Sequence, residues 1–308
     1  MNALFPTLHF TATTGERALV LGGGGSTGNA WLIGVIAGLF DAGLDVTTAD
    51  LTIGTSAGST AAAQMAGASP TELFAAAVAP VPQRRTPPAG PDTARVAHRP
   101  RAEHLERLLE TIASAEDLTD LRRRMGAAAR AREAQSDGSW QAQWRTTVAS
   151  RLPAQRWPER LLLITAVDAE TGDPVVFDCD SGVDLVDAVA ASCAGGGLPY
   201  RIGGTPYIDG GYRASAENAD LAVGHERVLV LSPLGGRTLH PLHWRTGLAV
   251  QAEELRRRGS PVETVIPESS AEHMFGANAM DLSLRPPAAR AGHDQGRVLA
   301  DRLGEFWN

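Results

Sequence analysis

The sequence predicts an α/β protein built on a mainly parallel sheet, because short apolar runs alternate with helical patterns and glycines separate them. Arg17–Gly22 is an apolar run that ends in glycines, which is typical of a buried strand. Apolar residues then recur at helical spacing over 31–40, and Gly43 follows as a C-cap candidate. Asp50–Gly54 predicts a second strand, and the alanine-rich stretch Ala57–Ala66 predicts a second helix. This alternation implies crossover connections between parallel strands.

The second half of the chain predicts the rest of the sheet. Turn residues at 170–173 separate two apolar runs, and Gly203-Gly204 separates two more, so each pair is expected to form a hairpin. The elements expected here are strands at Leu161–Val167, Val175–Asp178, Tyr200–Gly203, Pro206–Ile208, Arg227–Leu231 and Val262–Ile266, a short helix at Asp184–Ser192 and a closing helix at Ala291–Trp307.

The sequence of residues 80–157 predicts a helical, arginine-rich insertion within a single domain of 308 residues. Prolines mark its start as an exposed loop, and apolar helical faces follow at 105–112 and 118–125. Arginines outnumber acidic residues here, although the whole chain carries a net charge of −7. Two interpretations stay open: packing decoration at one edge of the sheet, or a lid that contacts lipid, because basic amphipathic helices suit anionic head groups. The prolines are Pro80, Pro82, Pro87, Pro88 and Pro91.

Composition and charge argue against several classes of protein. The negative net charge argues against a general nucleic-acid binder, which usually shows a basic excess. No window approaches the roughly 18 consecutive apolar residues of a membrane span. Met1–Gly15 lacks a basic cluster followed by an apolar run, so no secretory signal is expected and the predicted location is cytoplasmic, with peripheral membrane contact left open. Cys179 and Cys193 cannot build a disulfide framework and are expected to be small thiols, buried or half-buried.

A G-x-S-x-G pattern between an apolar strand and a helix is the strongest local signal. Gly54–Gly58 reads GTSAG, and a tight strand-to-helix turn needs small residues such as Gly54 and Gly58 beside the serine. Such a turn holds the hydroxyl of Ser56 at the head of a helix, where the dipole favours negative charge. A glycine-rich turn without function also matches so short a pattern.

A glycine run, Gly22–Gly28, lies between the first strand and the first helix. Its spacing matches the G-x-G-x-x-G of dinucleotide-binding folds, which is a weak signal by itself. Consecutive backbone amides can also converge into an oxyanion hole. The second use is favoured because the serine turn follows on the next strand, and because neither Asp45 nor Asp50 ends that strand as a ribose-binding acid would. The expected donors are the amides of Gly23, Gly24, Gly25 and Ser26, with Gly28 supporting the motif.

The third motif is Tyr207–Gly211, YIDGG, and an isolated Asp-Gly-Gly is most often a plain turn. Together the three motifs resemble the patatin-like phospholipase family, in particular bacterial members, which carry a glycine-rich loop, a G-x-S-x-G turn and a D-G-G in this order. The stretches Ser192–Gly211, Asn218–Asp220 and Ala279–Gly292 are also similar to those members. The resemblance therefore extends from about Arg17 to the C-terminus and is weakest in the insertion.

The resemblance implies a three-layer α/β/α sandwich and a hydrolase of lipid acyl esters that uses a Ser–Asp dyad without histidine. Ser56 would attack the acyl carbonyl, Asp209 would remove its proton, and the glycine loop would stabilise the oxyanion. A carboxylate is a weak base for a serine hydroxyl, so Asp209 needs partial desolvation. Where many members have arginine before the last glycine of the loop, this chain has Thr27, which leaves substrate preference open. Gly210 and Gly211 complete the aspartate motif.

Other interpretations remain in view. A Ser-His-Asp hydrolase would need a histidine after Ser56, and five are available by order, none in a recognisable loop signature. A nucleotide-binding protein and a catalytically weak or silent patatin-like lipid-binding module are the other two. The intact serine, aspartate and glycines argue against the silent module. No metal or cofactor is expected, because H-E-x-x-H, C-x-x-C and EF-hand spacings are missing, and no oligomeric state is predicted. The histidines are His225, His240, His243, His273 and His293.

Overall fold

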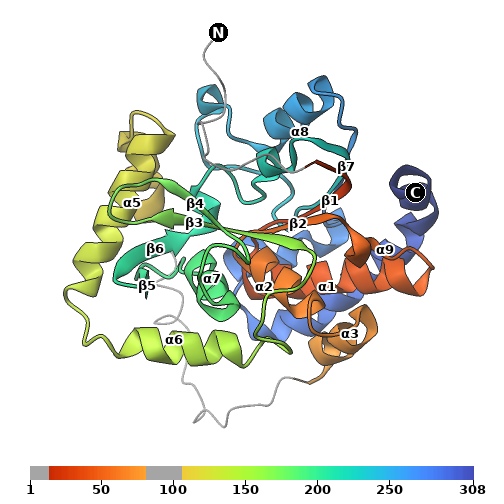
Figure 1. Cartoon of the computed structure of the whole chain (residues 1–308), viewed down its shortest axis with the longest axis horizontal. Coiled ribbons are helices and arrows are strands. Elements are labelled where there is room, and N and C mark those ends of the chain that lie inside the picture. The colour runs from red at the N-terminus through yellow and green to blue at the C-terminus, as the bar shows by residue number, and fades with distance from the viewer. Residues whose placement is uncertain (1–13, 81–105) are drawn as a thin grey trace.

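A computed structural model describes residues 14–80 and 106–308 (Figure 1). The stretch in which no secretory signal is expected, apart from its last two residues, and the predicted proline loop after Pro80 lie outside the described residues. The strands are β1 (Gly15–Leu21), β2 (Leu51–Gly54), β3 (Leu161–Asp168), β4 (Pro174–Phe177), β5 (Tyr200–Ile202), β6 (Thr205–Asp209), β7 (His225–Leu231) and β8 (Val262–Val265). The α-helices are α1 (Gly25–Asp41), α2 (Ala57–Met65), α3 (Pro70–Val78), α5 (Leu118–Glu133), α6 (Ser139–Ala149), α7 (Leu185–Ser192), α8 (Leu248–Arg257) and α9 (Arg285–Trp307). The short 3-10 turns are η1 (Val46–Thr48), η2 (Gly210–Tyr212), η3 (Ala219–Ala222), η4 (Leu242–Trp244), η5 (Ser269–Met274), η6 (Gly276–Asn278) and η7 (Leu282–Leu284).

One mixed sheet of eight strands organises the described chain, in the order β5-β6-β3-β2-β1-β7-β8, with β4 paired to β3. The run from β3 through β2, β1 and β7 to β8 is parallel. The pairs β3–β4, β3–β6 and β5–β6 are antiparallel. The mainly parallel sheet and both hairpins expected from the sequence are therefore confirmed.

Helices cover both faces of this sheet. Alternate side chains of the central strands, such as Leu19 and Ile164, face a large core formed with α1, α2, α3, α7 and α9. The intervening side chains, such as Val20 and Val228, pack on the opposite face against α8 and η3. Helix α5 covers β3 and β6 on that second face. In Figure 1, α1, α2 and α7 accordingly lie on one side of the strands and α8 on the other. The three-layer sandwich is confirmed.

Helices α1 and α9 pack backbone against backbone through glycines. A Cβ atom added to Gly34 would lie 2.1 Å from the carbonyl oxygen of Ala289, and one added to Gly296 would lie 2.3 Å from that of Val35. Gly38 and Gly292 make equally close approaches, so each helix carries a Gly-x-x-x-Gly stripe facing the other. Since residue numbers rise together along the contact, the two helices are parallel. The stripes place the first turn of α9 beside the first turn of α1.

Some element boundaries differ from the sequence-based expectation. Helix α1 begins at Gly25, so the second half of the glycine run is its first turn. Helix α9 begins at Arg285 instead of Ala291, because Pro286 and Pro287 fall in the first turn, where a missing N–H costs no helical hydrogen bond. Residues 106–114 are helical, but Leu109, expected on the apolar face, is 43% exposed. No strand occurs within the described part of the insertion, 106–157.

Candidate active site

Strand register brings Ser56 and Asp209 together. Strand β4 pairs with both Ile164 and Ala166 of β3, so it occupies one edge of that strand. On the other edge, Gly54 pairs with Ile164 and Asp209 pairs with Ala166. Strands β2 and β6 therefore approach one another end to end along the same edge of β3. The residues that follow Gly54 must turn away beside Asp209, and Ser56 is one of them.

The serine stands in a strained turn between β2 and α2. Its backbone has φ 52° and ψ −112°, a conformation that non-glycine residues rarely adopt and that clusters at functional sites. The neighbouring glycines permit this turn: a Cβ at Gly58 would lie 1.9 Å from the carbonyl oxygen of Leu21, and one at Gly54 would lie 2.6 Å from the Cα of Ser59. The Ser56 amide donates to the hydroxyl of the buried Ser192 at 2.9 Å. The turn thus fixes the serine while leaving it half-buried and accessible.

The Ser56 hydroxyl donates to Oδ2 of Asp209 at 2.8 Å. Oδ1 of the same carboxylate accepts from the Gly211 amide at 2.8 Å, which fixes the plane of the carboxylate. Burial raises the pKa of Asp209 from 3.8 to about 6, although the hydrogen bonds from Gly211 and Ser56 act in the opposite direction. The site therefore holds a desolvated carboxylate in direct contact with a serine hydroxyl.

A buried polar cluster, not foreseen from the sequence, joins the two halves of this site. The side-chain amide of Asn218 donates to the hydroxyl of Thr55 at 3.0 Å and to the carbonyl of Gly210 at 3.0 Å. Thr55 precedes the serine and Gly210 follows the aspartate, so Asn218 ties both turns together. Thr165 of β3 completes the cluster through its hydrogen bond to Thr55 at 3.0 Å. The resemblance around Asn218 was the only sequence signal for it.

The glycine loop adjoins the serine: a Cβ at Gly23 would lie 3.6 Å from the Cβ of Ser56. The amide of Gly23, however, donates to the carbonyl of Ala216 at 2.8 Å. The expectation that Gly23 serves as an oxyanion donor is therefore wrong, because its N–H is already engaged within the protein. The amides of Gly24, Gly25 and Ser26 find no acceptor among the described residues. They precede or begin α1, where helix geometry leaves N–H groups unpaired.

The remaining motif residues act through close packing. Gly28 lies in the first turn of α1 against Pro233, and a Cβ there would lie 3.1 Å from the proline ring. A Cβ at Gly210 would lie 2.2 Å from the hydroxyl of Thr165. Thr27 is fully buried, and its hydroxyl has no hydrogen-bond partner among the described residues. The position at which the resemblance leads one to expect an arginine therefore holds a small, buried side chain.

Neither a cysteine nor a histidine takes part in the hydrogen bond between Ser56 and Asp209. Both cysteines are free. Cys193 is half-buried as expected, but the expectation is wrong for Cys179, which is exposed. The Cys193 thiol donates to the carbonyl of Ser56 at 3.0 Å, and burial raises the pKa of this thiol. Where the described histidines make hydrogen bonds, their partners lie elsewhere, such as Asp41 for His293. None is hydrogen-bonded to Ser56 in the part of the chain that the structure covers.

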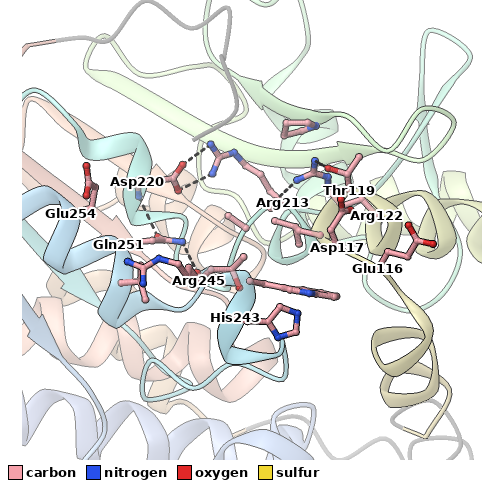
Figure 2. A pocket seen from close by; sticks show the side chains of 16 residues that line it. Glu116, Asp117, Thr119, Arg122, Arg213, Asp220, His243, Arg245, Gln251 and Glu254 are labelled. Atoms are coloured by element: carbon pink, nitrogen blue, oxygen red, sulfur yellow. Dashed lines mark hydrogen bonds and ion pairs between the residues drawn. The ribbon is translucent and has the colours of Figure 1, made fainter. Parts of the chain in front are cut away.

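A separate cavity of about 430 Å³ lies on the opposite face of the sheet, between the start of α5, η4 and α8 (Figure 2). Neither Ser56 nor Asp209 lines it. Figure 2 shows Arg213 facing Asp220, with which it forms a buried ion pair at 2.9 Å. Arg213 also donates to the side-chain oxygen of Asn218 at 3.1 Å. Through this contact, the wall of the cavity is connected to the polar cluster that joins the Ser56 and Asp209 turns.

Over 14–80 and 106–308, no three His, Cys, Asp or Glu side chains gather in a way that could hold a metal ion. No helix in the same ranges has the length and apolar character needed to cross a membrane.

Comparison with known proteins identifies the family of the chain. Residues 19–223 match the sequence model of the family described as patatin-like phospholipase. Among curated proteins, none is similar enough to count as a match. A solved structure, VipD from Legionella pneumophila, is 12% identical, with a TM-score of 0.40, covering 94% of this chain and 68% of its own. The family match spans most of the chain, including the glycine loop, the serine turn and the aspartate motif, and the chain therefore belongs to the patatin-like phospholipase family.

Proposed function

We propose that the protein is a serine acyl-ester hydrolase that cleaves carboxylic esters of lipids, in the manner of a phospholipase A, lysophospholipase or esterase. The observation that carries this proposal is the 2.8 Å hydrogen bond from the Ser56 hydroxyl to the buried carboxylate of Asp209. A strained turn presents the serine and the glycine loop adjoins it, with the amides of Gly24, Gly25 and Ser26 lacking an acceptor among the described residues. These are the nucleophile, base and oxyanion donors that acyl transfer requires.

In the proposed first half-reaction, Asp209 takes the hydroxyl proton of Ser56 as Oγ attacks the acyl carbonyl. The carbonyl oxygen becomes an oxyanion, which the amides of Gly24, Gly25 and Ser26 stabilise. When the intermediate collapses, the protonated Asp209 returns its proton to the departing alcohol, and the acyl group remains on Ser56. In the second half-reaction the carboxylate takes a proton from water, whose oxygen attacks the acyl-enzyme. Collapse then releases the carboxylic acid, and the proton returns to Ser56.

The environment of Asp209 supports its role as base. With its pKa raised to about 6, the carboxylate is mainly ionised at neutral pH and more basic than an exposed aspartate. Even so, it remains a weak base for a hydroxyl group, so much of the rate must come from the oxyanion donors. Loss of one such donor typically costs about 10²–10³ in rate.

The proposal is tested with wild type, Ser56→Ala and Asp209→Asn against a panel of p-nitrophenyl esters, lysophospholipids and phospholipids. We expect wild type to hydrolyse at least one class, and both variants to lose activity while keeping the wild-type circular dichroism spectrum. A fluorophosphonate probe should label wild type and not Ser56→Ala. A folded wild type that neither hydrolyses esters nor reacts with the probe would instead support a silent lipid-binding module.

We propose that any contact with an anionic lipid surface is peripheral, weak and sensitive to salt. Most arginines in the described part of the insertion, such as Arg123, Arg124 and Arg156, are exposed, but some are engaged within the protein. Arg122 is buried and donates to the carbonyls of Gly172 and Arg213, and Arg145 pairs with Asp187 at 2.8 Å. Fewer cations therefore face solvent than the sequence implies. Flotation with anionic vesicles at low and high salt tests this, and salt-resistant binding would contradict it.

A further inference from the structure

The segment 279–285, which follows the residues matched by the family model, packs against the proposed oxyanion loop. The amide of Thr27 donates to the carbonyl of Ala279 at 3.0 Å. Gly25, with φ 64°, lies so close that a Cβ there would come within 2.8 Å of the same carbonyl and 3.0 Å of the sulfur of Met280. The stretch from Ala279 to the start of α9 therefore forms one wall of the loop, although it follows the residues 19–223 that define the family match.

Arg285, the first residue of α9, is the polar end of this wall. Its Nη1 donates to the carbonyl oxygen of Ser26 at 2.8 Å and to the hydroxyl of Ser26 at 3.1 Å. Its Nη2 donates to the side-chain oxygen of Asn29 at 3.3 Å. One guanidinium thus donates hydrogen bonds to two residues in the first turns of α1. The parallel glycine packing of α1 on α9 fixes the register that brings it there.

The charge of Arg285 is not neutralised by a carboxylate among the described residues. Burial lowers the pKa of this guanidinium, and the neighbouring Arg151 lowers it further. The group nevertheless stays charged, because arginine side chains do not lose their proton in proteins. Residues 22–31, which contain the loop itself, include no basic residue. Arg285 is therefore a cation that a distant part of the chain supplies to the loop.

We propose that Arg285 is a positioning residue for the oxyanion hole: it fixes Ser26 so that the amides of Gly25 and Ser26 face the reacting carbonyl. Its unpaired positive charge also favours the negative charge that develops there. This inference rests on the proposed function, because it assigns a role only if Ser56 carries out acyl transfer. Arg285 itself need not touch the substrate, so its loss should slow the chemical step more than it weakens substrate binding.

The test compares Arg285→Gln and Arg285→Lys with wild type, using kcat and KM for a p-nitrophenyl ester and the rate of Ser56 labelling by a fluorophosphonate. Arg285→Gln should lower kcat and the labelling rate about 10- to 100-fold, as expected for loss of a charged hydrogen bond, and should change KM less than about 3-fold. Arg285→Lys keeps the charge and should recover part of the loss. Addition of guanidinium ion to Arg285→Ala should also raise kcat.

Arg290→Gln is the matched control, because Arg290 is an exposed arginine of the same helix and should leave kcat unchanged. Kinetics are compared only for variants whose thermal transition stays cooperative, and Arg285→Lys provides the comparison if Arg285→Gln does not fold. Unchanged kcat in folded Arg285→Gln, or a rise in KM alone, would overturn the inference. If wild type shows no Ser56-dependent hydrolysis or labelling, the proposed function fails instead, and the two failures are thus distinct.

Discussion

Replacing Asp209 by asparagine should stabilise the fold while abolishing hydrolysis. Burial raises the pKa of Asp209 from 3.8 to about 6, so the folded protein holds the carboxyl proton more tightly than the unfolded chain does. A difference of about 2 in pKa, at about 1.4 kcal/mol each, corresponds to about 3 kcal/mol. Asparagine is nearly isosteric and neutral, and it can still accept the hydrogen bond from Gly211. The free energy of unfolding of Asp209→Asn should therefore lack the penalty that wild type incurs by ionising a buried carboxyl group.

The sign of the effect fixes its pH dependence. Below pH 3.8 the carboxyl group is protonated in both states and imposes no cost. As pH rises towards 6, the unfolded chain ionises freely, while the folded protein must ionise a buried group, so wild type loses stability. The advantage of Asp209→Asn should thus grow from about 1 kcal/mol at pH 4.5 to about 3 kcal/mol at pH 8.

Chemical denaturation of both proteins across this pH range measures the difference. In thermal unfolding at pH 8, the variant should melt on the order of 5 °C higher. Asp301→Asn, which removes an exposed carboxylate on α9, is the control and should show a change below about 0.5 kcal/mol. If Asp209→Asn is less stable than wild type at pH 8, or if its advantage does not vary with pH, the desolvation argument is refuted.

Three further predictions follow from the same structure. Ser192→Ala removes the acceptor of the Ser56 amide and should lower kcat about 10-fold, measured by steady-state kinetics with unchanged circular dichroism. In wild type, kcat/KM should rise with pH through a midpoint of about 6 as Asp209 ionises, and a flat profile between pH 5 and 7 would contradict its role as base. Gly34→Ala drives a methyl group into the backbone of α9 and should cost more than about 2 kcal/mol in denaturation, whereas Gly196→Ala, which meets no atom within 4 Å, should stay within about 0.5 kcal/mol.

Much of the fold could be predicted from the sequence, because its signals are local. Short apolar runs, some of them ending in glycine, predicted the strands, and turn residues predicted both hairpins. The closing helix was placed too late, because Pro286 and Pro287 indicate a break when the chain is considered alone. In the structure the same prolines occupy a first turn, where they cost nothing.

The sequence predicted the motif residues of the candidate site, but not the tertiary contacts that position them. The pairing of Ser56 with Asp209 came from the order of three motifs, but the register that joins them depends on β6 continuing the edge that β2 leaves. The engagement of the Gly23 amide by Ala216 is a tertiary contact that no local pattern encodes. Arg285 lies 259 residues from Ser26, a separation at which a lone arginine gives no signal.

The parallel packing of α1 and α9 also determines where their dipoles point. Each helix carries partial positive charge at its N-terminus, and parallel neighbours place these like ends side by side. Antiparallel helices would cancel one another, so the glycine stripes hold an electrostatically unfavourable pair in contact. The positive ends of both helices, one of 17 and one of 23 residues, meet beside Ser26. The two positive helix ends repel one another in the absence of substrate. An acyl oxyanion bound beside Ser26 would reduce this repulsion.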